Sequence, residues 1–115
     1  MKRAILLALT NPRSDEVDQS FNEWYNNQHL ADVVPGVVAA QRFRVTDVEV
    51  VPGAQPSHRY LAVYEVEDEN DVAAVAQRVA DAQIPMDPSL DVEGMVAFYY
   101  EPISERVTAE DAPAG

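Results

Sequence analysis

Residues 3–10, RAILLALT, form an almost uninterrupted apolar run that stops at Asn11 and Pro12. A run of this length predicts a strand that is covered on both faces. Further apolar patterns follow it along the chain. They predict a helix over residues 14–34, strands over 37–45 and 59–66, a second helix over 68–83 and a last strand over 92–101.

The predicted order of elements, β-α-β-β-α-β, is that of the ferredoxin-like fold. We therefore predict one α+β domain over residues 1–103, with a four-stranded antiparallel sheet and two helices on one face. The strands carry apolar residues at both parities, as Leu61 and Val63 do beside Tyr60 and Tyr64. Two helices cover only one face, and a large exposed apolar face is unfavourable on a monomer. We expect a homodimer in which two sheets face each other as an α/β barrel around a cavity lined by aromatic residues.

The composition of the chain limits which partners and which cellular compartment are expected. The chain has 115 residues and a formal net charge of −12, so neither nucleic acid nor an anionic membrane surface is an expected partner. It has no cysteine, which suits a reducing compartment. The apolar run near the start is too short to cross a bilayer and lacks a small-residue cleavage site. We expect a cytoplasmic protein.

The first helix is expected to pack one narrow stripe on the sheet. Apolar residues after His29 fall outside this stripe, so the helix should fray or change direction there, before Pro35 and Gly36 end it. The predicted stripe consists of Val17, Phe21, Trp24, Gln28 and Ala31.

The end of the chain differs in composition from the rest. Residues 104–115 are acidic, rich in Ala and Pro, and show no periodic apolar set. We expect them to form a flexible C-terminal tail.

Two neighbouring segments, FNEWYNNQHL at 21–30 and VPGVVAAQRFRV at 34–45, carry a motif. An aromatic pair, Trp24 and Tyr25, precedes His29, and Pro35-Gly36 leads into the second strand, which contains Ala40-Gln41-Arg42-Phe43. Over about residues 2–102 the chain resembles the dimeric α/β-barrel superfamily, in particular its EthD-like branch. The stretch between His29 and Pro35 is shorter than in that pattern. The resemblance implies the fold but no single reaction, because the superfamily holds monooxygenases, polyketide cyclases, dehydratases, isomerases and haem enzymes.

His29 is the candidate catalytic residue. An imidazole can accept and donate a proton near neutral pH, as dehydration, cyclisation and isomerisation require. Tyr25 lies one turn before His29 and is a second candidate, which would orient the imidazole or the substrate. The structural alternative for His29 is a partly exposed side chain stabilised by the C-terminal end of the helix dipole.

The candidate substrate-binding residues are aromatic or hydrogen-bonding. Arg42 could hold a carboxylate or enolate through its planar guanidinium, and Asn26 could orient a substrate oxygen. Each has a structural alternative, namely core packing for Trp24, dimer packing for the strand aromatics and a surface ion pair for Arg42. The full set is Trp24, Asn26, Arg42, Tyr60, Tyr64, Phe98 and Tyr100.

The sequence predicts neither a cofactor nor a metal. It has no glycine-rich phosphate loop, and its two histidines lie far apart. The leading hypothesis is a cofactor-independent enzyme that dehydrates, cyclises or isomerises a small hydrophobic, oxygenated molecule of polyketide, aromatic or lactone type. One alternative is a cofactor-free monooxygenase of the same fold. Another is a non-catalytic dimer for small-molecule binding or assembly, which would be favoured by a barrel filled with side chains.

Overall fold

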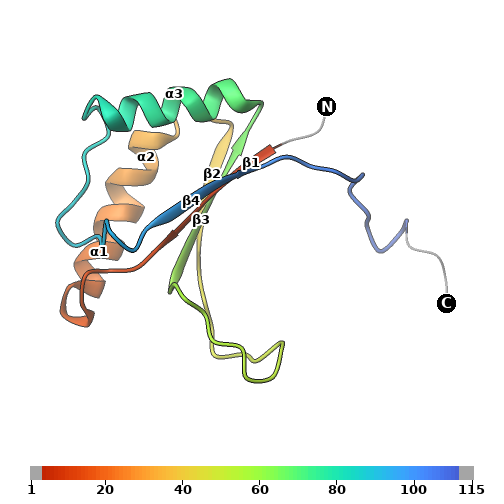
Figure 1. Ribbon diagram of the computed structural model, residues 1–115, viewed down its shortest axis with the longest axis horizontal. Helices are drawn as coiled ribbons and strands as arrows, with labels where there is room; N and C mark the ends of the chain where they lie inside the picture. The colour runs from red at the N-terminus through yellow and green to blue at the C-terminus, as the bar shows by residue number, and fades with distance from the viewer. Residues whose placement is uncertain (1–3, 112–115) are drawn as a thin grey trace.

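The computed structural model describes residues 4–111, which fold in the predicted order (Figure 1). The strands are β1 (Ala4–Thr10), β2 (Ala39–Arg44), β3 (Tyr60–Val66) and β4 (Val96–Tyr100), and they form one antiparallel sheet in the order β2-β3-β1-β4. A continuous helical segment follows β1 and comprises η1 (Asp15–Val17), α1 (Asp18–Trp24), the π-helix η2 (Tyr25–His29) and α2 (Leu30–Val33). Helix α3 (Glu69–Ala80) follows β3. The α+β ferredoxin-like fold predicted from the sequence is confirmed.

Two strands are shorter than predicted. β2 ends at Arg44, after which residues 45–59 leave the sheet as a long loop. β4 begins only at Val96, because the preceding residues form a turn in which the amide of Gly94 donates to the carboxylate of Asp91 at 3.2 Å. Polar turn hydrogen bonds therefore replace sheet pairing where the apolar pattern alone favours a strand.

The two faces of the sheet are unlike. Along β3, Tyr60, Ala62, Tyr64 and Val66 are buried, whereas the residues between them are half-buried. This alternation has the period of two that a strand covered more completely on one face requires. We call the buried side, which lies under the helices, the covered face, and the opposite side the open face.

The strand register assigns the remaining residues to these faces. Arg42 lies opposite Ala62, so it belongs to the covered face, and Phe43 lies opposite Leu61 on the open face. The open face stays rich in apolar side chains that contact solvent: Phe43 is 46% exposed, Phe98 52% and Tyr100 47%. Leu7, Leu9, Leu61 and Val63 complete its centre.

The buried stripe of the first helical segment differs from the predicted one. Phe21, Tyr25, His29 and Val33 are buried, whereas Gln28 and Ala31 of the predicted stripe are exposed. In a regular α-helix, residues four apart drift by about 40° around the axis. The wider turn of η2 reduces this drift, so a spacing of four keeps one face on the sheet. The prediction of an irregularity near His29 is therefore correct in position, and the irregularity is a π-helix.

Helix α3 fixes the end of this helical segment. The guanidinium of Arg78 donates to the backbone carbonyl of Pro35 at 2.6 Å and to that of Asp32. These carbonyls lie at or beyond the last turn of α2, where they have no intrahelical partner. At the other end of α3, the carboxylate of Asp68 accepts a hydrogen bond from the amide of Asn70 and caps the helix.

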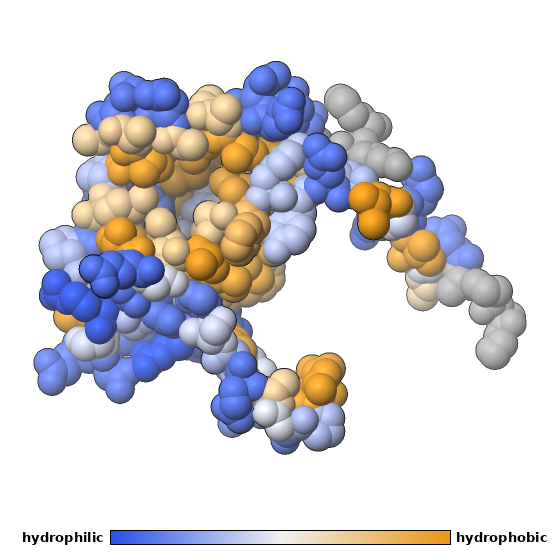
Figure 2. Space-filling view, viewed as in Figure 1, coloured by the Kyte–Doolittle hydropathy of each residue, from blue (hydrophilic) through white to orange (hydrophobic). Residues whose placement is uncertain are grey.

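Two segments project from the body of the molecule. The loop after β2 extends at one end of the sheet, and the chain after β4 leads away from it (Figure 1). Hydrophobic side chains show on both projections (Figure 2). The exposed ones are Val48, Val50 and Val51 on the loop and Ile103 and Val107 after β4.

Candidate functional site

Five of the predicted site residues meet on the covered face. Trp24, Tyr25 and His29 come from the helical segment, and Arg42 and Tyr64 come from β2 and β3. The π-helix η2 keeps Tyr25 and His29 turned toward the sheet. Arg42 and Tyr64 belong to the strand residues whose side chains point away from the open face. We call these five residues the covered-face cluster.

His29 is one of two buried titratable groups of the helical segment, the other being Tyr25. The ring of His29 stacks on Trp24 with 4.7 Å between ring centroids and meets Tyr25 edge-on, also at 4.7 Å. His29 is only 5% exposed, and its Nδ1 is buried without a hydrogen-bond partner among residues 4–111. The alternative of a partly exposed histidine is wrong, because the π-helix turns the side chain inward.

The surroundings of His29 favour a neutral imidazole. Burial lowers the pKa of His29 from 6.5 to about 4, although the nearby carboxylate of Asp32 acts in the opposite direction, and the charge of Arg42 lowers the pKa further. The loss of hydration on burial destabilises the imidazolium more than the nearby carboxylate stabilises it. At neutral pH the ring is therefore in its base form.

Two tyrosine hydroxyl groups of the cluster meet in a hydrogen bond. The oxygens of Tyr25 and Tyr64 lie 3.0 Å apart in a buried hydrogen bond. Burial raises the pKa of both phenols, while the charge of Arg42 acts against the rise. Both groups remain protonated at neutral pH and can serve as hydrogen-bond donors.

Arg42 lies against the faces of three aromatic rings. Its guanidinium carbon is 4.2 Å from the ring centroid of Tyr25, 5.0 Å from that of Tyr60 and 5.4 Å from that of Phe21. Cation–π attraction of this kind stabilises a partly desolvated guanidinium. Its Nη1 donates to the Oδ1 of Asn26 at 2.8 Å, whereas Nε and Nη2 are buried without a hydrogen-bond partner in the described part of the chain.

A small hollow opens beside the cluster, at the rim between the helical segment and β2. It has a volume of about 250 Å³, and Arg42 forms part of its wall. His29 is not among its lining residues. These are Asn22, Asn26, Arg42, Phe43, Arg44 and Tyr60.

Two further predicted binding residues contact the cluster through Arg42, namely Asn26 by a hydrogen bond and Tyr60 by its ring, whereas the other two lie apart from it. Phe98 and Tyr100 lie on the open face, where their rings are 6.5 Å apart, whereas Tyr60 and Tyr64 lie beneath the helices. The expectation that the strand aromatics form one pocket wall is therefore wrong, because strand parity places them on opposite sides of the sheet. The hydrogen bond between Tyr25 and Tyr64 joins residues 39 positions apart, and no local sequence pattern predicts it.

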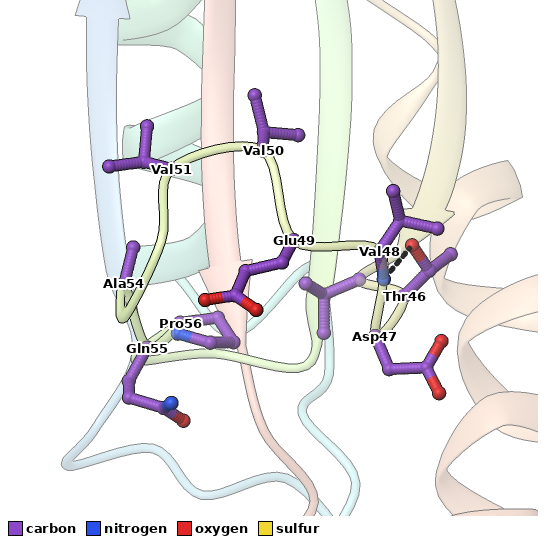
Figure 3. A pocket seen from close by; sticks show the side chains of 10 residues that line it. Thr46, Asp47, Val48, Glu49, Val50, Val51, Ala54, Gln55 and Pro56 are labelled. Atoms are coloured by element: carbon purple, nitrogen blue, oxygen red, sulfur yellow. Dashed lines mark hydrogen bonds between the residues drawn. The ribbon is translucent and has the colours of Figure 1, made fainter.

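A larger hollow, of about 730 Å³, lies inside the loop after β2 (Figure 3) and is lined by residues of that loop and its base. Glu49 points into the loop and accepts a hydrogen bond from the amide of Gly53 at 2.5 Å, while Val50 and Val51 point outward (Figure 3). Its lining includes two carboxylates, Asp47 and Glu49, but no histidine, arginine or tyrosine, so it is a poorer candidate for chemistry than the covered-face cluster.

Within residues 4–111, no group of three or more His, Cys, Asp and Glu side chains is placed to hold a metal ion. In the same range, no helix combines the length and apolarity needed to cross a membrane.

Comparison with known proteins gives limited sequence similarity. No family model matches the chain. A curated relative, core atranone cluster (CAC) protein 1 of Stachybotrys chlorohalonatus, is 36% identical over 67 residues, which are 56% of this chain and 26% of that protein. The matched part thus spans about a quarter of the relative's length.

Solved structures share the fold at low identity. An EthD-like protein of Ralstonia eutropha has a TM-score of 0.60 and 16% identity, covering 92% of this chain and 97% of its own. A dimeric ferredoxin-like protein of Jannaschia sp. has a TM-score of 0.55 and 17% identity, covering 87% and 99%. A MhuD variant with two manganese protoporphyrin IX molecules per active site has a TM-score of 0.57 and 16% identity, covering 91% and 99%. The fold resembles that of EthD-like and other dimeric ferredoxin-like proteins, in agreement with the resemblance drawn from the sequence.

Proposed function

We propose that the protein is a cofactor-independent enzyme that moves a proton within a small hydrophobic, oxygenated molecule, and so dehydrates, cyclises or isomerises it. The observation that carries this proposal is a buried, neutral imidazole within one cluster with two protonated phenols and a guanidinium. Such a set offers a base, hydrogen-bond donors and a positive charge for a developing enolate. The name of the curated relative, which refers to the atranone cluster, is consistent with small-molecule chemistry.

The roles follow from the protonation states. His29 accepts the proton, because it is neutral at physiological pH. The imidazolium that forms is a strong acid in this buried setting, so it returns the proton readily to another position of the substrate. Tyr25 donates a hydrogen bond to the substrate oxygen, with its hydroxyl positioned by Tyr64, and Arg42 stabilises the negative charge that develops there.

The metalloporphyrin of the MhuD variant is a property of that protein. In this chain, Trp24 stacks on the imidazole of His29 and Tyr25 meets it edge-on. The hollow beside the cluster measures about 250 Å³, which is below the roughly 300–1,000 Å³ of pockets that hold drug-sized ligands. The cluster as it stands does not fit a porphyrin.

The proposal includes a homodimer joined through the open face. Phe43, Phe98 and Tyr100 are about half exposed there, and a second sheet would remove them from water. The Jannaschia neighbour is itself described as dimeric, which supports the same arrangement here.

A second candidate is a non-catalytic binding dimer. It is favoured by the dense packing around Phe21, which is fully buried, and by the position of His29 outside the wall of the rim hollow. In that case the covered-face cluster would stabilise the fold, and ligands would occupy only the rim.

A comparison of variants separates the two candidates. Aromatic and polyketide-like compounds are first screened by thermal shift, and those that bind are assayed for turnover. His29→Gln should keep the dimer and the affinity while lowering turnover by roughly 10²- to 10⁴-fold, and Tyr25→Phe should lower it less because the ring remains. Binding without turnover in the native protein, or full turnover in His29→Gln, would reject the proposed role of His29.

A further inference from the structure

The rim hollow has an unusual charge for this protein. The chain carries a net charge of −12, yet the six residues that line the hollow include two arginines and no carboxylate. Arg42 and Arg44 form no ion pair with any residue in the described range 4–111. The two arginines attract an anion to the hollow, although the net negative charge of the chain repels it.

The carboxylates nearest to the hollow are already engaged. Asp18 accepts a hydrogen bond from the hydroxyl of Tyr60 at 2.6 Å and lies 3.6 Å from the guanidinium of Arg59. The same guanidinium also pairs with Asp15. Asp18 therefore does not neutralise the two arginines of the hollow, although its field weakens theirs.

The donors of the hollow are oriented by fixed contacts. Arg42 lies on the ring of Tyr25 and donates to the Oδ1 of Asn26, which leaves the Nδ2 of Asn26 as a donor without a partner in the described structure. Arg44 lies two residues further along β2, on the same face as Arg42, and is exposed. Together these groups match a carboxylate.

We propose that the rim hollow binds the carboxylate of a small organic acid, with Arg42, Arg44 and the amide of Asn26 as its contacts. This inference deepens the proposed function, because it assigns a carboxylate to the substrate class of the same site. Arg44 is then a specificity residue, which separates acids from neutral molecules of the same shape. The volume of about 250 Å³ suits the charged end of such a molecule rather than the whole of it.

The test uses benzoate as the probe and benzamide as its neutral counterpart, with binding to the full-length protein measured by calorimetry at low and high salt. Benzoate should bind more tightly than benzamide by roughly tenfold, and the difference should shrink at high salt. Arg44→Gln should weaken benzoate binding several-fold and leave benzamide unchanged, and Arg42→Gln should weaken it by roughly tenfold or more. Arg106→Gln is the matched control, since it removes the same charge from an exposed position outside the hollow.

Equal affinity for the two probes, no benzoate binding at millimolar concentration, or equal effects of Arg44→Gln and Arg106→Gln would overturn the inference. Arg44 is exposed, so its variant tests the hollow even if Arg42→Gln fails to fold. These measurements need no turnover. The carboxylate site can therefore fail while His29 remains the base, and the reverse outcome is equally visible.

Discussion

The covered and open faces of the sheet distribute polarity in opposite ways. The covered face buries a histidine and two tyrosine hydroxyls and half-buries an arginine beneath the helices, whereas the open face presents phenylalanine, tyrosine, leucine and valine side chains to solvent. In a typical soluble domain the polar groups would contact water and the apolar ones would be buried. The reversal indicates that each face serves a purpose beyond folding of the single chain.

The alternation of side chains along each strand gives the two faces of the sheet different properties. Neighbouring residues of one strand, such as Arg42 and Phe43, point to opposite sides. One parity therefore supplies a buried polar cluster suited to chemistry, and the other supplies a surface suited to a second copy. A substitution on one face should disturb one task and leave the other largely intact.

The largest expected effect concerns the open face. Phe98→Glu should convert a dimer of twice 12.7 kDa into a monomer, because a buried unpaired carboxylate is incompatible with an apolar interface. Light scattering with size exclusion measures the mass. Val50→Glu adds the same charge on the projecting loop and should leave the dimer intact. A native protein of 12.7 kDa that is stably folded would contradict the dimer.

On the covered face, Phe21→Ala should lower the free energy of unfolding by about 3–5 kcal/mol, because the ring is fully buried between the helix and the sheet. Urea denaturation gives this quantity. Val50→Ala, at a side chain that is 87% exposed, should change it by less than about 0.5 kcal/mol. A small loss for Phe21→Ala would mean that the covered face is not tightly packed.

The buried imidazole also makes stability depend on pH. The pKa of His29 is about 4 in the folded protein and near 6.5 when unfolded, so the unfolded state binds more protons between these values. The contribution is fully present above pH 6.5 and is lost as the pH falls toward 4. It amounts to about 2 kcal/mol between pH 7 and pH 5. Denaturation of the native protein and of His29→Gln over this range isolates the effect, and parallel curves would refute it.

The smallest effect is expected far from both faces. Residues 101–111 are exposed and form no helix or strand, so deletion of residues 110–115 should change the free energy of unfolding by less than about 0.5 kcal/mol. Thermal melting at matched protein concentration measures this. A strong loss of stability would show that the tail packs against the domain or against a second copy.

The fold could be predicted from the sequence, because apolar runs and the alternation of apolar and polar residues are local signals. The order of elements and the uncovered apolar face both follow from patterns within a few residues. His29 and Tyr25 could be chosen by residue type, and Arg42 by its parity on the strand.

The arrangement of the site could not be predicted from the sequence in the same way. An ideal helical period places Gln28 inward and His29 at the margin, but the π-helix reverses this, and nothing in the residues 25–29 signals the extra turn width. The pairing of Tyr25 with Tyr64 and the placement of Arg42 over three rings depend on how the helix packs across the sheet. Such contacts arise from tertiary packing and have no local sequence pattern.

The charge state of His29 is the property on which the proposed proton transfer depends most directly. Nuclear magnetic resonance of the imidazole carbons across pH 3–8 measures its pKa, and His29→Gln assigns the signal against that of His58. We predict a pKa of about 4 for His29, so that the ring is neutral and ready to accept a proton at physiological pH. A pKa near 6.5 would show an imidazole in contact with water and would contradict the buried site.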